Sequence, residues 1–511
     1  MDDNRGHRRR WYALMAVGIL LHFFAMANSD LGLDAHVRLN AAMDGQQDGQ
    51  DLAWGKLRMD DSSGQAPTDE QVYDGYISPW FESELAAKFT AFMGVLGVAC
   101  LAGLAPRGGN RSPSFDPVKP ALILLSPIFL FVSARGYDES VLALVAGFGM
   151  VGFLFNQGEE RAQRLLHVVM MAASVMLLLG WKGFSPVASI GAFLMTVALG
   201  VGWVVVEEKS SGPFGAWLVH PWKMAISCVA VVFLAVFTLG LMTETGTFGV
   251  IGQRPVAFVL ATMVALIHSI VLFLLVGFVL WPLLTVRWSS LSSLRGVGPT
   301  MLASYIAVLL AGIAAYIGAL WTLESQLWGR SMVETMLVLG NNGRYATAVL
   351  LPLVFLLSWP TDEDDRDFAS QESRRVKVGL LVLLPLMLFI SFYGQQLWSD
   401  DAGAWLAESM EEEESCFVMV AQETLAMHHL YVIKSNVDLT GEQGIDGYWR
   451  SAPDVKAFVE SSPDCAALML VAPGEDYTPG EGWALVHEQA APYTLSGGAD
   501  AGSWKVFRAI G

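Results

Sequence analysis

Residues 11–28, WYALMAVGILLHFFAMAN, run directly into residues 29–40, SDLGLDAHVRLN. The first stretch is apolar and about long enough to cross a bilayer as one helix. Four arginines lie among the ten residues before it, and no small-residue cleavage site leads from it into a soluble domain. We therefore expect a retained membrane span that begins in the cytoplasm and delivers the polar stretch to the other side.

The composition of the rest of the chain indicates the same class of protein. Hydrophobic residues make up 53% of the sequence and charged residues only 16%. Apolar blocks recur as far as residue 394, which predicts a polytopic α-helical membrane protein with about 11 transmembrane helices. The expected spans are residues 11–28, 86–105, 119–134, 141–156, 165–180, 186–206, 223–243, 257–283, 299–321, 345–360 and 377–394.

The distribution of Lys and Arg predicts the orientation of these spans. Basic residues gather in every second short connection, which is typical of cytoplasmic loops. An odd number of spans then exports the segment that follows the last one. We expect three parts, namely a cytoplasmic N-terminus at 1–10, a transmembrane domain at 11–394 with a large extracytoplasmic first loop at 29–85, and an extracytoplasmic domain at 395–511.

The exported C-terminal segment is expected to form a small α/β domain. Apolar, β-branched runs predict its strands, and one run with proline in its first turn predicts a helix. We place strands at 416–421, 430–433, 466–471, 483–487 and 504–510, and the helix at 452–460. Cys416 and Cys465 both lie in this exported part, where oxidation would allow a disulfide between them.

The charge balance limits the partners of the chain. Its formal net charge of −18 argues against nucleic acid, because an acidic surface repels phosphate. Acidic runs such as residues 411–414 are expected to be solvated surface. Membrane lipids are the partners that the apolar spans require.

The polar stretch after the first span contains the first candidate site. Asp30, Asp34, His36 and Arg38 fall within nine residues, and spacings of four would align the two aspartates, and Asp34 with Arg38, on one face of a helix. One interpretation is an interfacial helix with an internal salt bridge. The functional interpretation makes Asp34 a general base or a metal ligand, while His36 and Arg38 contact phosphate.

A second candidate site is the short turn at residues 133–140, SARGYDES, between the third and fourth expected spans. Asp138 and Glu139 could simply stabilise the start of the next helix. Together with Asp34 from the same side of the membrane, they could instead supply oxygen ligands for Mg²⁺ or Mn²⁺. Arg135 lies in the same turn.

The third candidate lies at residues 340–347, GNNGRYAT, which run into an apolar block. Arg344, followed by Tyr345, could bind a phosphate at the exported end of a span, or its stem could simply lie along lipid. Other residues have weaker claims. Lys182, Glu244, Arg254 and Arg330 show no spacing signal, and His22, His268, His428 and His429 are expected to be packing or surface residues.

This layout resembles the GT-C superfamily of membrane glycosyltransferases. The resemblance rests on the cytoplasmic N-terminus, the long exported loop that opens with an acidic motif, the many further spans, an Arg-Tyr pair before a late span that contains proline, and the exported C-terminal domain. It implies a sugar donor carried on polyprenyl or dolichyl phosphate. It also implies that an acidic residue of the first loop works at the acceptor site, which here is Asp34, with Asp30 as second choice.

Two branches of that superfamily offer closer comparisons. The turn from Ser133 through Arg135 to Asp138 and Glu139 is similar to, but shorter than, a turn of the oligosaccharyltransferase catalytic subunit that joins a first-loop aspartate around a divalent metal. The tail lacks the Trp-Trp-Asp-Tyr-Gly motif of that subunit. Protein mannosyltransferases and aminoarabinose transferases carry Asp-Glu in the first loop, where this chain has Asp34, Ala35 and His36. The member family and the metal requirement therefore stay open.

The function expected from these residues is an inverting transfer of a sugar from a polyprenyl-phosphate donor to a protein, lipid or glycan acceptor on the extracytoplasmic face. A multi-span transporter or lipid flippase is the first alternative, although such proteins usually place charges near mid-membrane. A noncatalytic membrane subunit is the second alternative. The sequence leaves the sugar and the acceptor undefined.

Overall fold

A computed structural model describes residues 2–44, 83–105, 115–182, 184–242, 246–277, 291–327, 329–359, 373–411, 414–421, 425–461, 467–492 and 502–510. The chain divides into two compact units, each built from separate segments. The helical unit comprises Met1–Ala27, Thr90–Ser133 and Asp138–Phe392, and the α/β unit comprises Asn28–Phe89, Ala134–Tyr137 and Tyr393–Gly511. The start of the first loop and the turn at Ala134–Tyr137 thus group with the C-terminal segment.

The helical unit is built almost entirely of α-helices, joined by short 3₁₀ and π segments. Its elements, in chain order, are α1 (Asp2–Asn28), α4 (Glu84–Leu104), α5 (Val118–Leu124), α6 (Pro127–Ala134), α7 (Glu139–Phe148), η3 (Val151–Leu154), α8 (Arg161–Trp181), α9 (Pro186–Lys209), α10 (Gly212–Leu218), α11 (Pro221–Met242), α12 (Gly246–Gln253), α13 (Pro255–His268), η4 (Ser269–Gly277), α15 (Val297–Leu327), α16 (Met332–Val338), η5 (Gly340–Val349), α17 (Leu350–Leu357), α19 (Ser373–Leu388) and η6 (Phe389–Tyr393).

Eight of the described helices are long and apolar enough to cross a membrane, judged by length and composition. They confirm the predicted fold class, a polytopic α-helical membrane protein followed by a C-terminal α/β part. These candidate spans are Arg8–Asn28, Glu84–Leu104, Arg161–Trp181, Pro186–Lys209, Pro221–Met242, Pro255–Leu274, Val297–Gln326 and Lys377–Ser409.

Three of the eleven expected spans are instead broken into short pieces. The run at 119–134 divides into α5 and α6 at Pro127, because proline lacks the N–H that would continue the helix and disfavours helical geometry in the preceding residue. The run at 141–156 divides into α7 and η3, and the run at 345–360 divides into η5 and α17. Nearly every residue of α5 and α17 is buried. These runs are apolar because they form the core of the unit.

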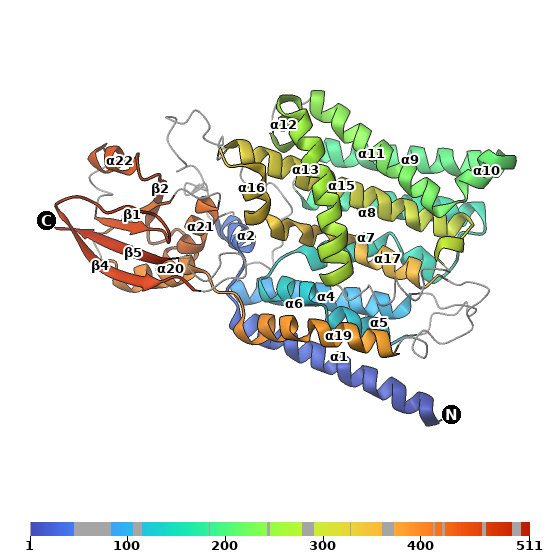
Figure 1. Ribbon diagram of the computed structural model, residues 1–511, viewed down its shortest axis with the longest axis horizontal. Helices are drawn as coiled ribbons and strands as arrows, with labels where there is room; N and C mark the ends of the chain where they lie inside the picture. Colours follow the sequence, from blue (N-terminus) through green and yellow to red (C-terminus); the bar gives the residue numbers. More distant parts are fainter. Residues whose placement is uncertain are drawn as a thin grey trace. The chain divides into compact units, whose positions relative to one another are not determined.

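The lipid-facing and core helices differ in how much of their surface the protein covers. Of the most apolar window of α15, 56% is buried, against 11% for α9 and 6% for α11. α15 packs along α11 and α13, and α8 packs along α9 (Figure 1). The exposed apolar side chains of α9 and α11 are therefore suited to contact with lipid rather than water.

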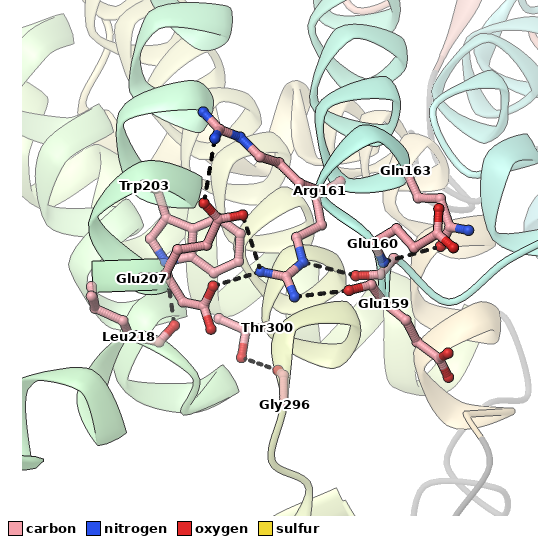
Figure 2. A network of polar contacts seen from close by, with 12 residues as sticks. Glu159, Glu160, Arg161, Gln163, Trp203, Glu207, Leu218, Gly296 and Thr300 are labelled. Carbon is pink, nitrogen blue, oxygen red and sulfur yellow. Dashed lines mark hydrogen bonds and ion pairs between the residues drawn. The ribbon is translucent and has the colours of Figure 1, made fainter. Parts of the chain in front are cut away.

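A polar network fastens the start of α8 to the end of α9, and Figure 2 shows it from close by. Arg164 donates from Nη1 to Glu207 Oε2 at 2.7 Å, from Nη2 to the Glu159 carbonyl at 2.9 Å and from Nε to the Gly158 carbonyl at 3.0 Å. Arg161 lies 3.8 Å from Glu208. Basic residues that suggested a cytoplasmic loop are thus also paired with carboxylates of the neighbouring helix.

The α/β unit contains a five-stranded mixed sheet. Its strands run in the order β2-β1-β3-β5-β4, in which β1 is parallel to β2 and β3, whereas β5 is antiparallel to β3 and β4. The elements of this unit are α2 (Leu33–Asp44), α20 (Trp398–Ser409), β1 (Cys416–Val420), α21 (Ala426–Val437), β2 (Asp446–Arg450), α22 (Val455–Ser461), β3 (Leu468–Val471), β4 (Trp483–Ala490) and β5 (Ser503–Ala509).

Helices cover both faces of this sheet. Neighbouring residues of a strand point to opposite sides, so each strand contributes side chains to both packed faces. On one face, Phe458 of α22 packs in a cluster with Val418 and Phe507. On the other face, Trp405 of α20 stacks on His487, which in turn contacts Trp504. Side chains from α20 and α22 therefore pack against the sheet, and Figure 1 shows where these helices lie beside its strands.

Two expectations for this unit were wrong. Residues 430–433 belong to helix α21 rather than a strand, and all four are buried, since α2, α20 and β2 surround the helix. An apolar run that is buried on all sides shows no helical period. The acidic run at 411–414 is not merely solvated, because Glu411 and Glu414 bind Arg508 of β5 at 3.2 and 3.0 Å. Cys416 is disulfide-bonded, and Cys465 lies outside the described residues.

Candidate functional site

The predicted site residues fall into two groups, one in each unit. Asp30, Asp34, His36, Arg38 and Arg135 belong to the α/β unit, whereas Asp138, Glu139, Arg344 and Tyr345 belong to the helical unit. The chain passes from one group to the other between Tyr137 and Asp138. Each group is described by itself.

Asp30 is held by the segment that follows the last apolar helix. Its Oδ2 accepts a hydrogen bond from the Leu397 backbone N–H at 2.6 Å, and its own N–H donates to the Gln395 carbonyl at 2.9 Å. The same carbonyl accepts from Arg135 Nη1 at 2.9 Å. Three segments that are far apart in sequence therefore meet at this carboxylate.

Glycines allow these backbones to approach so closely. Gly394 has φ +75°, and a Cβ built on it would collide with the Asn28 carbonyl. Gly136 has φ +62°, and a Cβ there would meet Leu31 and Ala87. Only glycine adopts such backbone geometry freely and leaves the space empty. The sequence alone gave no sign of this packing.

The surroundings of Asp30 disfavour its charged form. Burial raises the pKa of Asp30 to about 6, helped by the negative charge of Asp400, while the hydrogen bond from Leu397 and the positive charge of Arg135 work in the opposite direction. A carboxylate with a pKa near 6 is largely deprotonated at neutral pH and still basic enough to take a proton from a hydroxyl. Among the predicted residues, Asp30 thus has the electrostatics of a general base.

Asp34 has a different environment. It lies in the first turn of α2, so Asp30 precedes the helix instead of sharing a helical face with it. The Asp34 side chain is 36% exposed, and its Oδ1 lies 3.7 Å from Nε2 of His428 on α21. His428 was expected to be a packing or surface residue, and the sequence gave no spacing signal that linked it to Asp34.

His36 belongs to a buried hydrogen-bond network between α2 and α21. Ser435 donates its single proton to the Tyr431 carbonyl, so its Oγ must accept from His36 Nδ1 at 2.9 Å and from Asn40 Nδ2 at 2.9 Å. The neutral ring therefore carries its proton on Nδ1, and Nε2 is an acceptor. This Nε2 is buried and has no hydrogen-bond partner among the described residues.

The charge state of His36 bears on its predicted phosphate contact. Burial, helped by the positive charges of Arg135 and Lys88, lowers the pKa of His36 to about 3. A neutral ring with an acceptor nitrogen would repel phosphate oxygens. His36 is better suited to accept a hydrogen bond from a hydroxyl. Arg38, which is buried with 5% exposure, retains the charge that a phosphate contact needs.

We expect His36 to make the protein sensitive to acid. Because its pKa is lowered in the folded chain, the unfolded chain takes up its proton first, and stability falls as the pH drops below about 6.5 toward 3, by up to about 1.4 kcal/mol per pH unit. Melting temperatures of the purified full chain between pH 8 and 4 should show this decline, with a shallower slope for His36→Gln. Equal slopes for the two proteins would contradict the assignment.

In the helical unit, the start of α7 meets η5 through a buried ion pair. Arg344 Nε lies 2.8 Å from Glu139 Oε1, and both side chains are almost fully buried. Thr347 of the same 3₁₀ segment donates to the Glu139 carbonyl at 3.1 Å. The predicted residues Glu139 and Arg344 are therefore direct partners, although 205 positions separate them.

Lys182, for which the sequence gave no spacing signal, completes this cluster together with Asp138 and Tyr345. Asp138 accepts a hydrogen bond from the Trp181 indole, and its Oδ1 lies 3.5 Å from Lys182 Nζ. The Lys182 ammonium sits 4.4 Å from the centre of the Tyr345 ring, and the Arg344 guanidinium lies 5.1 Å from it. We call Asp138, Glu139, Lys182, Arg344 and Tyr345 the paired-charge cluster.

The metal role predicted for Asp34, Asp138 and Glu139 stays a prediction, and the contacts of Asp138 and Glu139 do not favour it. No group of three or more His, Cys, Asp or Glu side chains suitable for a metal occurs in the part of the chain that the structure describes. Asp138 and Glu139 already have Lys182 and Arg344 as their cationic partners. A divalent ion would have to displace both cations, so these carboxylates do not fit Mg²⁺ or Mn²⁺ as they stand.

Comparison with known proteins gives little guidance. No protein-family model matches the chain, and no curated protein matches it. It is similar to two solved structures of the arabinofuranosyltransferase AftD from Mycobacteria, one of them a mutant, at 16% and 15% identity and with TM-scores of 0.34 and 0.33. Each match covers 99% of this chain but only 40% and 42% of the other. We draw neither fold nor activity from a likeness of this strength.

Proposed function

We propose that the chain is an integral membrane glycosyltransferase. It moves a sugar from a polyprenyl-phosphate donor, of the dolichyl-phosphate type, to a hydroxyl of a protein, lipid or glycan acceptor. The proposal places the N-terminus in the cytoplasm and the α/β unit outside it, as the basic loops indicate. The proposal also assigns the chain to the GT-C superfamily, which its sequence resembles.

The observation that carries this proposal is the environment of Asp30. A buried carboxylate with a pKa near 6 lies where the first loop, the turn that contains Arg135 and the segment after the last apolar helix meet. A perturbed carboxyl beside a guanidinium at the end of a membrane span suits proton transfer on a lipid-borne substrate. We therefore assign the role of general base to Asp30 and keep Asp34 as the alternative.

The reaction is a single inverting displacement. Asp30 takes the proton of the acceptor hydroxyl, whose oxygen forms a bond to the anomeric carbon of the sugar. The bond between that carbon and the phosphate oxygen breaks, and its electron pair stays on the phosphate, which leaves with its lipid. We assign to His36 Nε2 the role of accepting a hydrogen bond from a second hydroxyl group of the acceptor. No step requires a metal ion.

The negative charge that develops on the departing phosphate must be stabilised. Arg38 and Arg135, which belong to the same unit as Asp30, are the cations that we assign to this task, because a planar guanidinium can bind two phosphate oxygens at once. Removing one preorganised donor of this kind typically slows a reaction by about 10²- to 10³-fold. Arg344 belongs to the helical unit and already binds Glu139, so we give it no part in this step.

A transporter or flippase remains the competing function. Such proteins place ionisable groups near mid-membrane. In the helical unit, Asp138 and Glu139 instead lie at the start of α7, and Lys182 lies just after α8, which is a candidate span. This position favours chemistry at one membrane face over passage through the bilayer. A noncatalytic subunit would need none of these buried charges.

A donor panel tests the proposal. The purified full chain should release lipid phosphate from at least one radiolabelled polyprenyl-phosphate sugar when an acceptor hydroxyl is supplied, and the rate should not depend on added Mn²⁺. Asp30→Asn serves as the inactive control. Absence of turnover with every donor, under conditions in which the protein is folded, would favour the transporter or subunit function.

A further inference from the structure

Two buried polar atoms in and beside the paired-charge cluster have no hydrogen-bond partner in the part of the chain that the structure describes. Glu139 uses Oε1 to bind Arg344, but its Oε2 has no hydrogen-bond partner among the described residues. Asn342, two positions before Arg344 on η5, likewise leaves its Nδ2 donor unused in that part of the chain. Glu139 is fully buried and Asn342 is 5% exposed. One is an unused acceptor on α7 and the other an unused donor on η5, and these two elements pack against each other.

Unused polar atoms of this kind need an explanation. A buried donor or acceptor without a partner costs about 1–3 kcal/mol, so folded proteins almost always satisfy such groups. Packing alone does not require either residue here, since a leucine would fill the place of Asn342 without this cost. The pair therefore points to a partner other than the described residues of the chain.

The charges of the cluster indicate what kind of partner fits. Asp138 with Lys182, and Glu139 with Arg344, bring two negative and two positive charges together, so the cluster has no net charge. An anion such as phosphate would gain little from it overall, and a cation would gain just as little. A neutral hydroxyl group can donate to Glu139 Oε2 and accept from Asn342 Nδ2.

We propose that the contact between α7 and η5 is a sugar-binding subsite within the helical unit, in which Glu139 and Asn342 bind hydroxyl groups of a sugar. This inference rests on the proposed function and adds to it a place where a sugar is recognised. Glu139 thereby changes from a predicted metal ligand to a hydroxyl acceptor. Arg344 holds the carboxylate in position through Oε1 and leaves Oε2 for the ligand.

The test measures equilibrium binding of polyprenyl-phosphate sugars to the full chain in detergent, with hexose and pentose donors and with their single-deoxy forms. For wild type, removal of one particular hydroxyl should weaken binding at least about tenfold, since the site is left with unpaired buried groups. Asn342→Leu should bind the intact donor about tenfold more weakly and should no longer distinguish it from that deoxy form. Glu139→Gln should likewise lose the distinction.

Thr347→Val provides the matched control. It removes a hydrogen bond between the same two elements but leaves both unused atoms in place, so it should keep the wild-type preference for the hydroxyl. If Asn342→Leu and Glu139→Gln weaken the intact and deoxy donors by one common factor, the residues act only through the fold and the inference is overturned. Binding without hydroxyl dependence in wild type also overturns it. Hydroxyl-dependent binding without turnover would refute the proposed function alone.

Discussion

Asp30→Asn should reduce sugar transfer by about 10²- to 10⁴-fold, the usual contribution of a general base. Asparagine retains the shape of aspartate and can still accept the 2.6 Å hydrogen bond from Leu397, so the backbone around it should hold. It cannot take a proton from the acceptor. The measurement is single-turnover release of lipid phosphate by the purified variant, with the melting temperature as a check on folding.

The same residue predicts how activity depends on pH. The base must be deprotonated, so kcat/KM should rise with pH through about 6 and level off above it. Asp34→Asn is the matched comparison, because Asp34 lies in the same segment but is 36% exposed and faces His428. We expect it to lose far less activity and to keep the profile. A large loss in Asp34→Asn together with a mild one in Asp30→Asn would transfer the role to Asp34.

The sequence predicted the class of the fold because long apolar blocks are typical of membrane-spanning helices. All eight candidate spans were expected, and the strands at 416–421, 483–487 and 504–510 correspond to β1, β4 and β5. The lengths of the helices within some apolar runs were predicted wrongly. The apolar runs that became α5 with α6 and η5 with α17 line the core of the helical unit, and hydropathy alone does not distinguish a core from a lipid surface.

The site could be predicted only where the chemistry is local. Asp30, His36 and Arg344 were found because charged groups beside apolar runs are costly and therefore conspicuous. Their partners come from distant segments. Lys182 was set aside because nothing near it in sequence indicates that Asp138 and Tyr345 lie beside it. Asn342 was missed because an asparagine between glycines is typical of a loop. Pairing across 205 positions, as for Glu139 and Arg344, has no signal in a single sequence.

Arg344→Leu should destabilise the protein by about 3–5 kcal/mol, the usual result of breaking a buried ion pair. The guanidinium is 2% exposed and its partner Glu139 1% exposed, so the loss leaves a carboxylate buried without its cation. Leucine replaces part of the buried volume but supplies no positive charge, so we expect most of the loss to come from the orphaned carboxylate. The free energy of unfolding, or the melting temperature of the full chain in detergent, measures it.

A double variant separates this cause from simple loss of packing. Removing both charges, in Arg344→Leu with Glu139→Leu, should restore much of the stability, because a buried ion pair and a well-packed apolar pair are often of similar energy. Arg161→Leu is the control for losing an arginine, since its 3.8 Å pair with Glu208 is 59% exposed on the arginine side and should contribute only about 0–1 kcal/mol. If the double variant is less stable than Arg344→Leu, the orphaned charge is not the cause.

Glu139 is also the proposed hydroxyl acceptor. The rescued double variant should therefore be stable and still bind the donor sugar poorly. This result would separate the structural role of the ion pair from its role in binding.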